Sequence, residues 1–510
     1  MPSGRAPAVG HSVSQPAVTR TPMICRRAAP AFLRNVRALK HTAGAAMSSC
    51  QSPACLQKDM EIPGRQLFGP GPSNMRDVIA DSQSRSLLGH LHPEFIKVMS
   101  DAREGLQYIF KTKNAYTFAV SGTGHAGMEC AVLNLLEKDD VFLVVEIGIW
   151  GKRAADLGAR IGAKVHTVTA PHGCAVEKEA IEEALAKYKP AVLFVCHGES
   201  STGVCQPLVG LGEACRRHGT LLLVDTVASL GGAEFRMDDW GVDCVYSATQ
   251  KVLNAPPGLA PISFSERAMQ KIRNRKERVP SFYFDVLELG NYWGCDDQAK
   301  RYHHTAPISC VYALRAALAV IAKEGIDEGV RRHEENAKFL YEKLKEAGLE
   351  CFVEKESTLV TFLLCKWIEV KRLCIRAEAS YHHTAPISCV YALRAALAVI
   401  AKEGIDEGVR RHEENAKFLY EKLKEAGLEC FVEKEKWRLP CLTTVKVPNG
   451  VDWKGVMDDM MKQGTEIAGG LGPTVGKLWR IGTFGGNSDK QKIENVVKLL
   501  AETIKKKSDI

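Results

Sequence analysis

Three absences narrow what this chain can be. No apolar run approaches the roughly 18 residues that a membrane-spanning helix needs; the nearest candidate, residues 358–365 (TLVTFLLC), is far too short. The 17 cysteines contain no CxxC pair at zinc spacing, and an odd number without a secretory signal favours free thiols in a reducing compartment. Aromatic residues make up only 7%, but 45% of the chain is hydrophobic and 25% charged, which excludes a disordered chain, a collagen and a coiled-coil rod.

Acidic residues are missing from the first 57 positions, which carry seven lysines and arginines. The rest of the chain has 61 basic and 60 acidic residues, so the net charge of +8 does not indicate nucleic-acid binding. An arginine-rich segment with serine and alanine but no acids is typical of a mitochondrial transit peptide, although residues 1–57 could also be a disordered basic tail. We expect import into the mitochondrial matrix, or a peroxisomal or cytoplasmic location if translation starts at Met47.

One segment of 55 residues occurs twice without a single change. Residues 302–356 recur as residues 381–435, and the 24 residues between the copies resemble nothing around them. Solenoid repeats diverge and need about three units to bury a shared core. We therefore interpret the extra copy as a duplicated exon or an error in assembling the chain from its gene. Intact-mass analysis of the native protein is expected to find a chain shorter by 79 residues.

Each copy is predicted to form two helices and then a strand. The apolar spacing of residues 309–325 suits a long helix that stops at Gly325, and residues 326–349 suit a second amphipathic helix that ends at Gly348. Both copies cannot fill one place in a folded domain. One of them must therefore expose its apolar face or pack elsewhere.

The middle of the chain alternates apolar strand-like segments with helical ones. This pattern predicts an α/β fold with a mainly parallel sheet covered by helices on both faces. The clearest strands are residues 141–147, 191–197, 220–226 and 243–249. In such a sheet, the ligand site lies in the crevice at the C-terminal ends of the strands.

Three features fall at those ends. A glycine-rich turn, residues 121–125 (SGTGH), precedes an apolar-periodic helix whose N-terminus would offer free N–H groups to a phosphate. Asp225 ends the apolar segment LLLV; a carboxylate there needs a cationic or hydrogen-bonding partner, or caps a helix, or binds a metal. Lys251 follows the next strand and precedes the stiff turn 254–258 (NAPPG).

Together these features suit pyridoxal phosphate. The lysine amine binds the cofactor aldehyde once burial lowers its pKa. The aspartate keeps the pyridine nitrogen protonated, and the glycine-rich turn holds the phosphate. Trp150 is large and flat enough to stack on the cofactor ring; its alternative role is that of a core tryptophan. No metal site is predicted.

Nine ordered motifs carry a family resemblance. They are GPGPSN (69–74), SGTGHAGME (121–129), GIWG (148–151), HGESSTGV (197–204), LLLVDTVASLGG (221–232), SATQKVLNAPPG (247–258), NYWGCDDQ (291–298), YHHT (302–305) and GGLGPTVGKLWRIG (469–482). From about residue 64 to 505, the chain resembles the alanine–glyoxylate/serine–pyruvate aminotransferases of the class V, fold-type I pyridoxal-phosphate family. The resemblance implies a large cofactor-binding domain over residues 58–324 and a smaller α/β domain over residues 325–510, with residues 357–435 as the anomalous insertion.

The resemblance also implies roles for single residues. Lys251 would carry the cofactor and act as catalytic acid and base, Asp225 would bind the pyridinium nitrogen, and Arg480 would grip the substrate carboxylate, which a planar guanidinium does better than an ammonium group. Seven further residues would contact the cofactor's phosphate, ring or hydroxyl: Thr123, Gly124, His125, Trp150, Ser200, Val227 and Gln250.

The duplicated segment carries two further implied cofactor contacts. Tyr302 and Thr305 match residues that reach across a dimer interface to the partner's phosphate. Tyr381 and Thr384 of the second copy match them equally well. The resemblance thus implies a homodimer and leaves open which copy serves it.

The implied activity is transfer of an amino group from alanine or serine to glyoxylate, which gives pyruvate or hydroxypyruvate and glycine. A 3-hydroxykynurenine transaminase of the same family is the alternative, because the loop 89–92 (GHLH) departs from the vertebrate alanine–glyoxylate pattern. A desulfurase would have histidine where Gln250 stands. The remaining alternative is a splice or gene-assembly variant that does not function, because its extra copy prevents folding or dimerisation.

Overall fold

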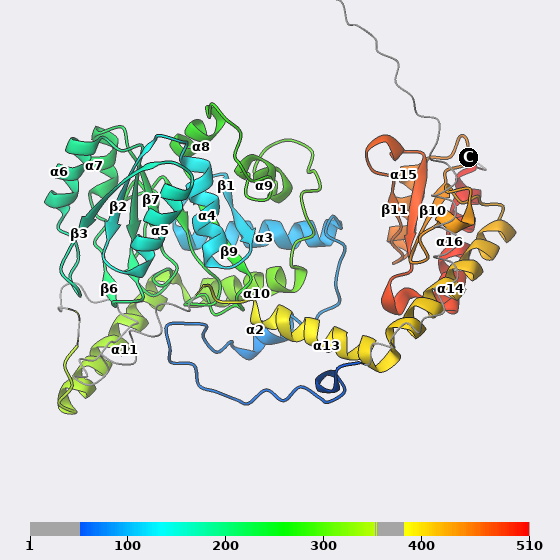
Figure 1. Ribbon diagram of the computed structural model, residues 1–510, viewed down its shortest axis with the longest axis horizontal. Coiled ribbons are helices and arrows are strands. Elements are labelled where there is room, and N and C mark those ends of the chain that lie inside the picture. Colours follow the sequence, from blue (N-terminus) through cyan, green and yellow to red (C-terminus); the bar gives the residue numbers. More distant parts are fainter. Residues whose placement is uncertain (1–51, 352, 354–381, 509–510) are drawn as a thin grey trace, which may run out of the picture. The chain divides into compact units, whose positions relative to one another are not determined.

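The computed structural model describes residues 52–351, 353 and 382–508 (Figure 1). The predictions made for residues 1–51, for the segment between the two copies and for Tyr381 lie outside the described residues. Within the described part, none of the helices is long and apolar enough to cross a membrane. The described part of the chain forms two compact units, one within residues 59–399 and the other made of residues 400–508 together with residues 52–58. Each unit is described separately below.

The first unit contains a seven-stranded sheet in the order β1-β9-β8-β7-β4-β2-β3. Neighbouring strands from β3 to β8 are parallel, whereas β9 runs antiparallel to both of its neighbours. The strands are β1 (Tyr116–Ser121), β2 (Val141–Glu146), β3 (Lys164–Thr169), β4 (Val192–Cys196), β7 (Leu221–Asp225), β8 (Cys244–Tyr246) and β9 (Leu259–Phe264), with a short hairpin of β5 (Gly198–Glu199) and β6 (Val204–Cys205). All four strands predicted from the sequence are confirmed.

Helices flank this sheet (Figure 1). They are α3 (Pro93–Phe110), α4 (Gly124–Leu135), α5 (Ile149–Arg160), α6 (Lys178–Tyr188), α7 (Leu211–Arg217), α8 (Glu266–Arg273), α9 (Val286–Trp293) and α10 (Ile308–Glu324). Two further helices, α2 (Asp77–Ser82) and α11 (Ile326–Glu346), pack mainly on α10. Every residue of β4 and β7 is buried, because strands covered by helices on both faces have no polar side. This continuous apolar character is what made the strands recognisable in the sequence.

The second unit is a small α/β fold. Its antiparallel sheet has the order β10-β12-β11. The elements are α14 (Ile405–Glu425), β10 (Leu442–Lys446), α15 (Trp453–Lys462), β11 (Ala468–Gly469), β12 (Leu478–Gly482) and α16 (Lys490–Ser508). The strand predicted at the end of each copy is reduced in the second copy to an isolated bridge between Cys430 and Val445. The sequence places the domain boundary after residue 324, whereas the contacts divide the chain at residues 399–400; the boundary at 324 stays a prediction.

The first helix of the repeat is packed in one copy only. In α10 the side chains of Val311, Leu314 and Leu318 are buried in the core of the first unit. Their counterparts lie in α13 (Ile387–Glu403), of whose side chains none is buried in the described structure. Leu314 is 0% exposed and the identical Leu393 is 59% exposed. The expectation that one copy must expose its apolar face is therefore confirmed for this helix.

For the second helix of the repeat, the C-terminal half is buried on one face in the second copy and largely exposed in the first. In α14, Leu419 and Leu423 are fully buried in the core of the second unit, against residues such as Trp479. In α11 the residue equivalent to Leu419 is Leu340, which is 44% exposed. The first helix of the repeat is thus packed in the first unit by the first copy, as α10. The second helix is packed in the second unit by the second copy, as α14.

Because equivalent side chains of the two copies differ in burial, the same substitution is expected to lower the free energy of unfolding by different amounts in the two copies. Leu419→Ala leaves a cavity in the second unit and is expected to lower its free energy of unfolding by about 2–5 kcal/mol. Leu340→Ala removes an exposed side chain, and its cost is expected to stay below about 0.5 kcal/mol. Urea denaturation of both variants measures the difference, and equal costs would contradict the assignment of the copies.

Candidate active site

The site lies where the sheet presents its strand ends. The C-terminal ends of β7 and β8, the loop after β8 and the N-terminus of α4 surround one cavity. The side chains that line it come from distant parts of the sequence, namely Thr123, Gly124, His125, Met128, Trp150, Asp225, Val227, Tyr246, Gln250, Lys251 and Thr384. The structure thus brings together most of the residues that the sequence analysis selected.

Asp225 is buried at the end of β7, where each oxygen of its carboxylate accepts one hydrogen bond. Its Oδ2 accepts from the hydroxyl of Tyr246 at 2.6 Å, and its Oδ1 accepts from the backbone N–H of Val227 at 2.7 Å. Burial raises the pKa of Asp225 to about 6, and these two hydrogen bonds and Lys251 counteract the shift. The carboxylate therefore stays charged at neutral pH and can bind a protonated ring nitrogen.

Lys251 projects into the same cavity from the loop after β8. Burial lowers the pKa of its amine to about 8, while the charge of Asp225 acts in the opposite direction. The ammonium group donates to the carbonyl oxygen of Pro70. At Gly71 φ is +109°, and a Cβ there would lie 2.4 Å from Lys251 Cδ, so only glycine allows the backbone to approach the lysine so closely.

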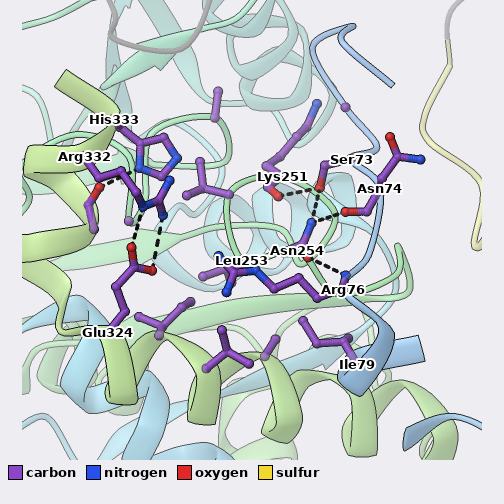
Figure 2. A pocket seen from close by; sticks show the side chains of 18 of the residues that line it. Ser73, Asn74, Arg76, Ile79, Lys251, Leu253, Asn254, Glu324, Arg332 and His333 are labelled. Carbon is purple, nitrogen blue, oxygen red and sulfur yellow. Dashed lines mark hydrogen bonds and ion pairs between the residues drawn. The ribbon is translucent and has the colours of Figure 1, made fainter. Parts of the chain in front are cut away.

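The segment containing Gly71 is fixed to the lysine loop by hydrogen bonds (Figure 2). Ser73 Oγ donates to the carbonyl oxygen of Lys251 at 3.0 Å and accepts from Asn254 Nδ2 at 3.0 Å. The backbone N–H of Arg76 donates to Asn254 Oδ1 at 2.9 Å. A second pocket of about 390 Å³ lies beside this segment, with the ion pair of Arg332 and Glu324 on its other side.

The N-terminus of α4 forms the side of the cavity that suits a phosphate. Thr123 is the N-cap of this helix, and the N–H groups of a first helical turn have no partners within the helix. His125 Nε2 lies 2.6 Å from Arg153 Nη1. Burial and the neighbouring Arg153 lower the pKa of His125 to about 4, so the imidazole is neutral and Arg153 supplies the positive charge.

Trp150, in the first turn of α5, also lines the cavity, and its ring meets that of His125 edge to face with centroids 5.6 Å apart. Its Nε1 donates to Ser200 Oγ at 2.8 Å, so Ser200 acts on the ring position rather than lining the cavity itself. Its backbone N–H donates to Glu199 Oε2 at 3.1 Å. A Cβ at Gly148 would lie 2.3 Å from Glu199 Cδ, which explains the glycine two positions before the tryptophan.

The residues present fit pyridoxal phosphate. Gln250 is buried at the cavity wall, and its Oε1 has no hydrogen-bond partner among the described residues. An unpaired buried amide oxygen is costly, and a ligand that donates to it would satisfy it. Lys251 would bind the aldehyde, Asp225 the ring nitrogen and the first turn of α4 the phosphate, with Trp150 and Val227 beside the ring.

Besides Ser200, three predicted site residues of the described part of the chain lie outside this cavity. Tyr302 is 48% exposed with its ring 4.8 Å from that of His90, and Thr305 lies 3.3 Å from the Tyr302 hydroxyl. Arg480 belongs to the second unit, on the central strand β12, where its Nε donates to the carbonyl oxygen of Gly469 at 2.7 Å. Among the described residues Arg480 forms no ion pair, so its remaining N–H groups can bind a carboxylate.

Sequence reasoning missed several residues of the site. Tyr246 was part of a predicted strand, but only its parallel register with Asp225 reveals that its hydroxyl holds the carboxylate. Arg153 and Glu199 act through His125 and Trp150. Arg153 lies outside the nine motifs, and Glu199 lies in the motif 197–204, where no role was predicted for it. The segment 69–74 was recognised as a motif without a role, and the structure gives it one beside Lys251.

The lowered pKa of Lys251 predicts how fast the apoprotein captures its cofactor. Only the neutral amine attacks an aldehyde, so the rate of capture is expected to rise with pH and to level off above about 8. An unperturbed lysine would give a midpoint near its usual value of about 10.4. Stopped-flow absorbance after mixing apoprotein with pyridoxal phosphate across this pH range measures the midpoint.

Comparisons with known proteins agree with this geometry. The family model "Aminotransferase class-V" matches residues 78–374. The chain is 39% identical over 453 residues to an alanine–glyoxylate aminotransferase of Callithrix jacchus, covering 89% of this chain and 90% of that protein. It is also 39% identical over 454 residues to one of Drosophila melanogaster, covering 89% and 95%.

A solved structure gives the same result. The alanine–glyoxylate aminotransferase of Nostoc sp. is 36% identical, with a TM-score of 0.53 over 88% of this chain and 97% of that one. The expected fold-type I α/β architecture is thereby confirmed. The cavity around Lys251, the family match and these relatives together establish that the chain belongs to the class-V aminotransferases, which are enzymes that use pyridoxal 5'-phosphate.

Proposed function

We propose that this enzyme transfers the amino group of alanine to glyoxylate, giving pyruvate and glycine, and that serine can replace alanine as donor. The observation that carries the proposal is the meeting of Lys251, Asp225 and the N-terminus of α4 in one cavity. The substrate assignment is supported by relatives named alanine–glyoxylate aminotransferase, which are 37–39% identical over about nine-tenths of the chain.

The residues of the chain divide the work of transamination. Pyridoxal phosphate, when bound, supplies an aldehyde and an electron-accepting ring. Lys251 Nζ, with its pKa lowered to about 8, would bind the aldehyde and, as a free amine, would move a proton to or from the substrate carbon as base and acid. Asp225, held by Tyr246 and Val227, keeps the ring nitrogen protonated. Arg480 binds the substrate carboxylate.

The test follows the visible absorbance of the cofactor bound to the purified chain. Adding alanine is expected to bleach the band and release pyruvate, and adding glyoxylate is expected to restore the band. The Lys251→Ala variant serves as the control that shows no such cycle. If only 3-hydroxykynurenine bleaches the band, the aminotransferase assignment stands and alanine is the wrong donor.

Arg480 is expected to act on substrate binding more than on the chemical step. Arg480→Lys keeps the charge but loses the two-pronged geometry, and the KM for alanine is expected to rise about tenfold to a hundredfold. Arg438→Lys is the matched control, because Arg438 lies in the same unit and binds the backbone oxygen of Val432. Steady-state kinetics of both variants decide the point, and an unchanged KM for Arg480→Lys would refute the role.

We also propose a homodimer and import into the mitochondrial matrix. The exposed Tyr302 and Thr305 support the dimer, since both are accessible to a second chain. The absence of acidic residues from the first 57 positions supports import. Sedimentation tests whether the chain is a homodimer. The location of a reporter fused to residues 1–57 tests import into mitochondria. A cytoplasmic or peroxisomal reporter would contradict import.

A further inference from the structure

Two cysteines of the repeat meet where its two copies approach each other in the first unit. Cys310 is the third residue of α10 and Cys389 is the third residue of α13, so the duplication gives them the same place in the repeat. Their Sγ atoms are 3.7 Å apart and share a hydrogen bond. The sulfur atoms of a disulfide are about 2.05 Å apart, so an approach of less than about 2 Å would allow these two to bond.

The two thiols differ in how accessible they are to a reagent. Cys310 is 2% exposed and lies in the core of the first unit. Gly258 leaves room for it, since a Cβ on that glycine would lie 2.9 Å from Cys310 Sγ. Cys389 is exposed and lines a cavity of about 500 Å³ together with Pro307 and Pro386. A dissolved oxidant therefore reaches Cys389 first.

The hydrogen bond between the two thiols gives them different charge states. The thiol of Cys310 donates to Cys389 Sγ, and this bond lowers the pKa of Cys389 to about 6. Cys389 also lies in the first turn of α13, where the helix dipole favours a thiolate. The same hydrogen bond and burial raise the pKa of Cys310. At neutral pH, Cys389 is thus a thiolate and Cys310 keeps its proton beside it.

Six other cysteines of the described chain are poor nucleophiles by comparison. Burial raises the pKa values of their thiols, which therefore stay protonated at neutral pH; they are Cys130, Cys196, Cys205, Cys215, Cys244 and Cys295. A reagent that reacts with thiolates is therefore expected to select Cys389 over these six.

We propose that Cys310 and Cys389 form a reversible disulfide, which joins the two copies of the repeat when the chain meets a low-molecular-mass disulfide. The Cys389 thiolate attacks one sulfur of the reagent, whose S–S bond breaks and whose other half leaves as a thiolate. Cys310 then gives up its proton and attacks Cys389 Sγ, so that the second half leaves. The two cysteines lose two electrons, the two halves of the reagent gain them, and one leaving thiolate takes the proton of Cys310.

The disulfide fixes the start of α13 on the unit that contains the cofactor cavity. It joins residues that are 79 positions apart in the sequence. Such a cross-link lowers the conformational entropy of the unfolded chain, so the oxidised first unit is expected to unfold at a temperature about 5–10 °C higher than the reduced one. The redox state thus decides how firmly the second copy is attached. The inference does not depend on which amino donor the enzyme uses.

Peptide mapping tests the pair directly, because trypsin releases the two cysteines in peptides of different length. Cys310 lies in the tryptic peptide 302–315, and Cys389 lies in the tryptic peptide 377–394. The reduced full chain is incubated with oxidised glutathione, its remaining thiols are alkylated, and the digest is analysed without reductant. We expect these two peptides, cross-linked to each other, as the main disulfide product. Dithiothreitol is expected to separate them.

Two alanine variants separate the roles of the thiols. In Cys310→Ala, no second thiol displaces glutathione, so the mixed disulfide on residues 377–394 is expected to accumulate. Loss of the hydrogen bond is also expected to move the pH midpoint for alkylation of Cys389 from about 6 towards the usual value of about 8.5. Cys389→Ala is expected to form neither product and to unfold at the same temperature with and without oxidised glutathione.

Three results would overturn the proposal. A cross-link between two copies of the peptide 377–394 would show that Cys389 pairs with a second chain. A mixed disulfide that accumulates equally in the wild type and in Cys310→Ala would show that Cys310 does not displace glutathione. An oxidised wild type that unfolds at the temperature of the reduced chain would show that the bond does not attach the second copy to the first unit.

Discussion

Lys251→Ala is expected to lose both the covalently bound cofactor and nearly all transaminase activity. The substitution removes the amine that binds the aldehyde and the group that moves the substrate proton. Proton transfer by a positioned residue contributes about 10²–10⁴-fold to a rate, so a fall of about four orders of magnitude in kcat is expected. Borohydride reduction followed by intact-mass analysis measures the covalent link, and steady-state assays measure the rate.

A second lysine provides the control for this variant. Lys271 lies on α8 and forms an ion pair with Asp140 at 2.9 Å, away from the cavity residues. Lys271→Ala is expected to keep both the covalent cofactor and the activity. A borohydride-stable adduct in Lys251→Ala would show that another amine carries the cofactor and would refute the assignment.

Deleting residues 357–435 is expected to stabilise the chain and to make cofactor binding depend on protein concentration. The deletion joins the first copy directly to Lys436, so α10 keeps its place and the single second helix supplies Leu340 where Leu419 now packs. Removing 79 residues from this connection lowers its loop-closure cost by about 0.6 kcal/mol for each halving of its length, so the free energy of unfolding is expected to rise by about 1–2 kcal/mol. The exposed apolar side chains of α13 disappear with it.

The loss of Thr384 in the same deletion has the second effect. Without the second copy, the cavity loses Thr384, one of its lining residues. Cofactor affinity is therefore expected to fall about tenfold at nanomolar chain concentrations and to recover as dimers form. Denaturation and cofactor titration of the shortened chain measure both effects. A shortened chain that is less stable than the full one would contradict the division of the copies between the two units.

Most of the catalytic chemistry could be predicted from the sequence. The turn 121–125 was predicted from its glycines and the helix after it, without a predicted strand before it. Asp225 ends one predicted strand and Lys251 follows another, and parallel strands end at the same edge of a sheet. Their meeting in one cavity follows from the fold class. Tyr246 and Arg153 could not be predicted in this way, because their roles depend on register and side-chain direction rather than on a motif.

By itself, the sequence determined the family, the cofactor and the position of the lysine that binds it. It also determined that two identical segments, residues 302–356 and 381–435, cannot both occupy the same position in the fold. Which copy fills which place was decided only by the tertiary structure, because identical residues have identical propensities. Leu314 is buried and Leu393 exposed, whereas Leu419 is buried and Leu340 exposed. The difference arises entirely from the apolar surfaces that each copy can reach from its point of attachment in the chain.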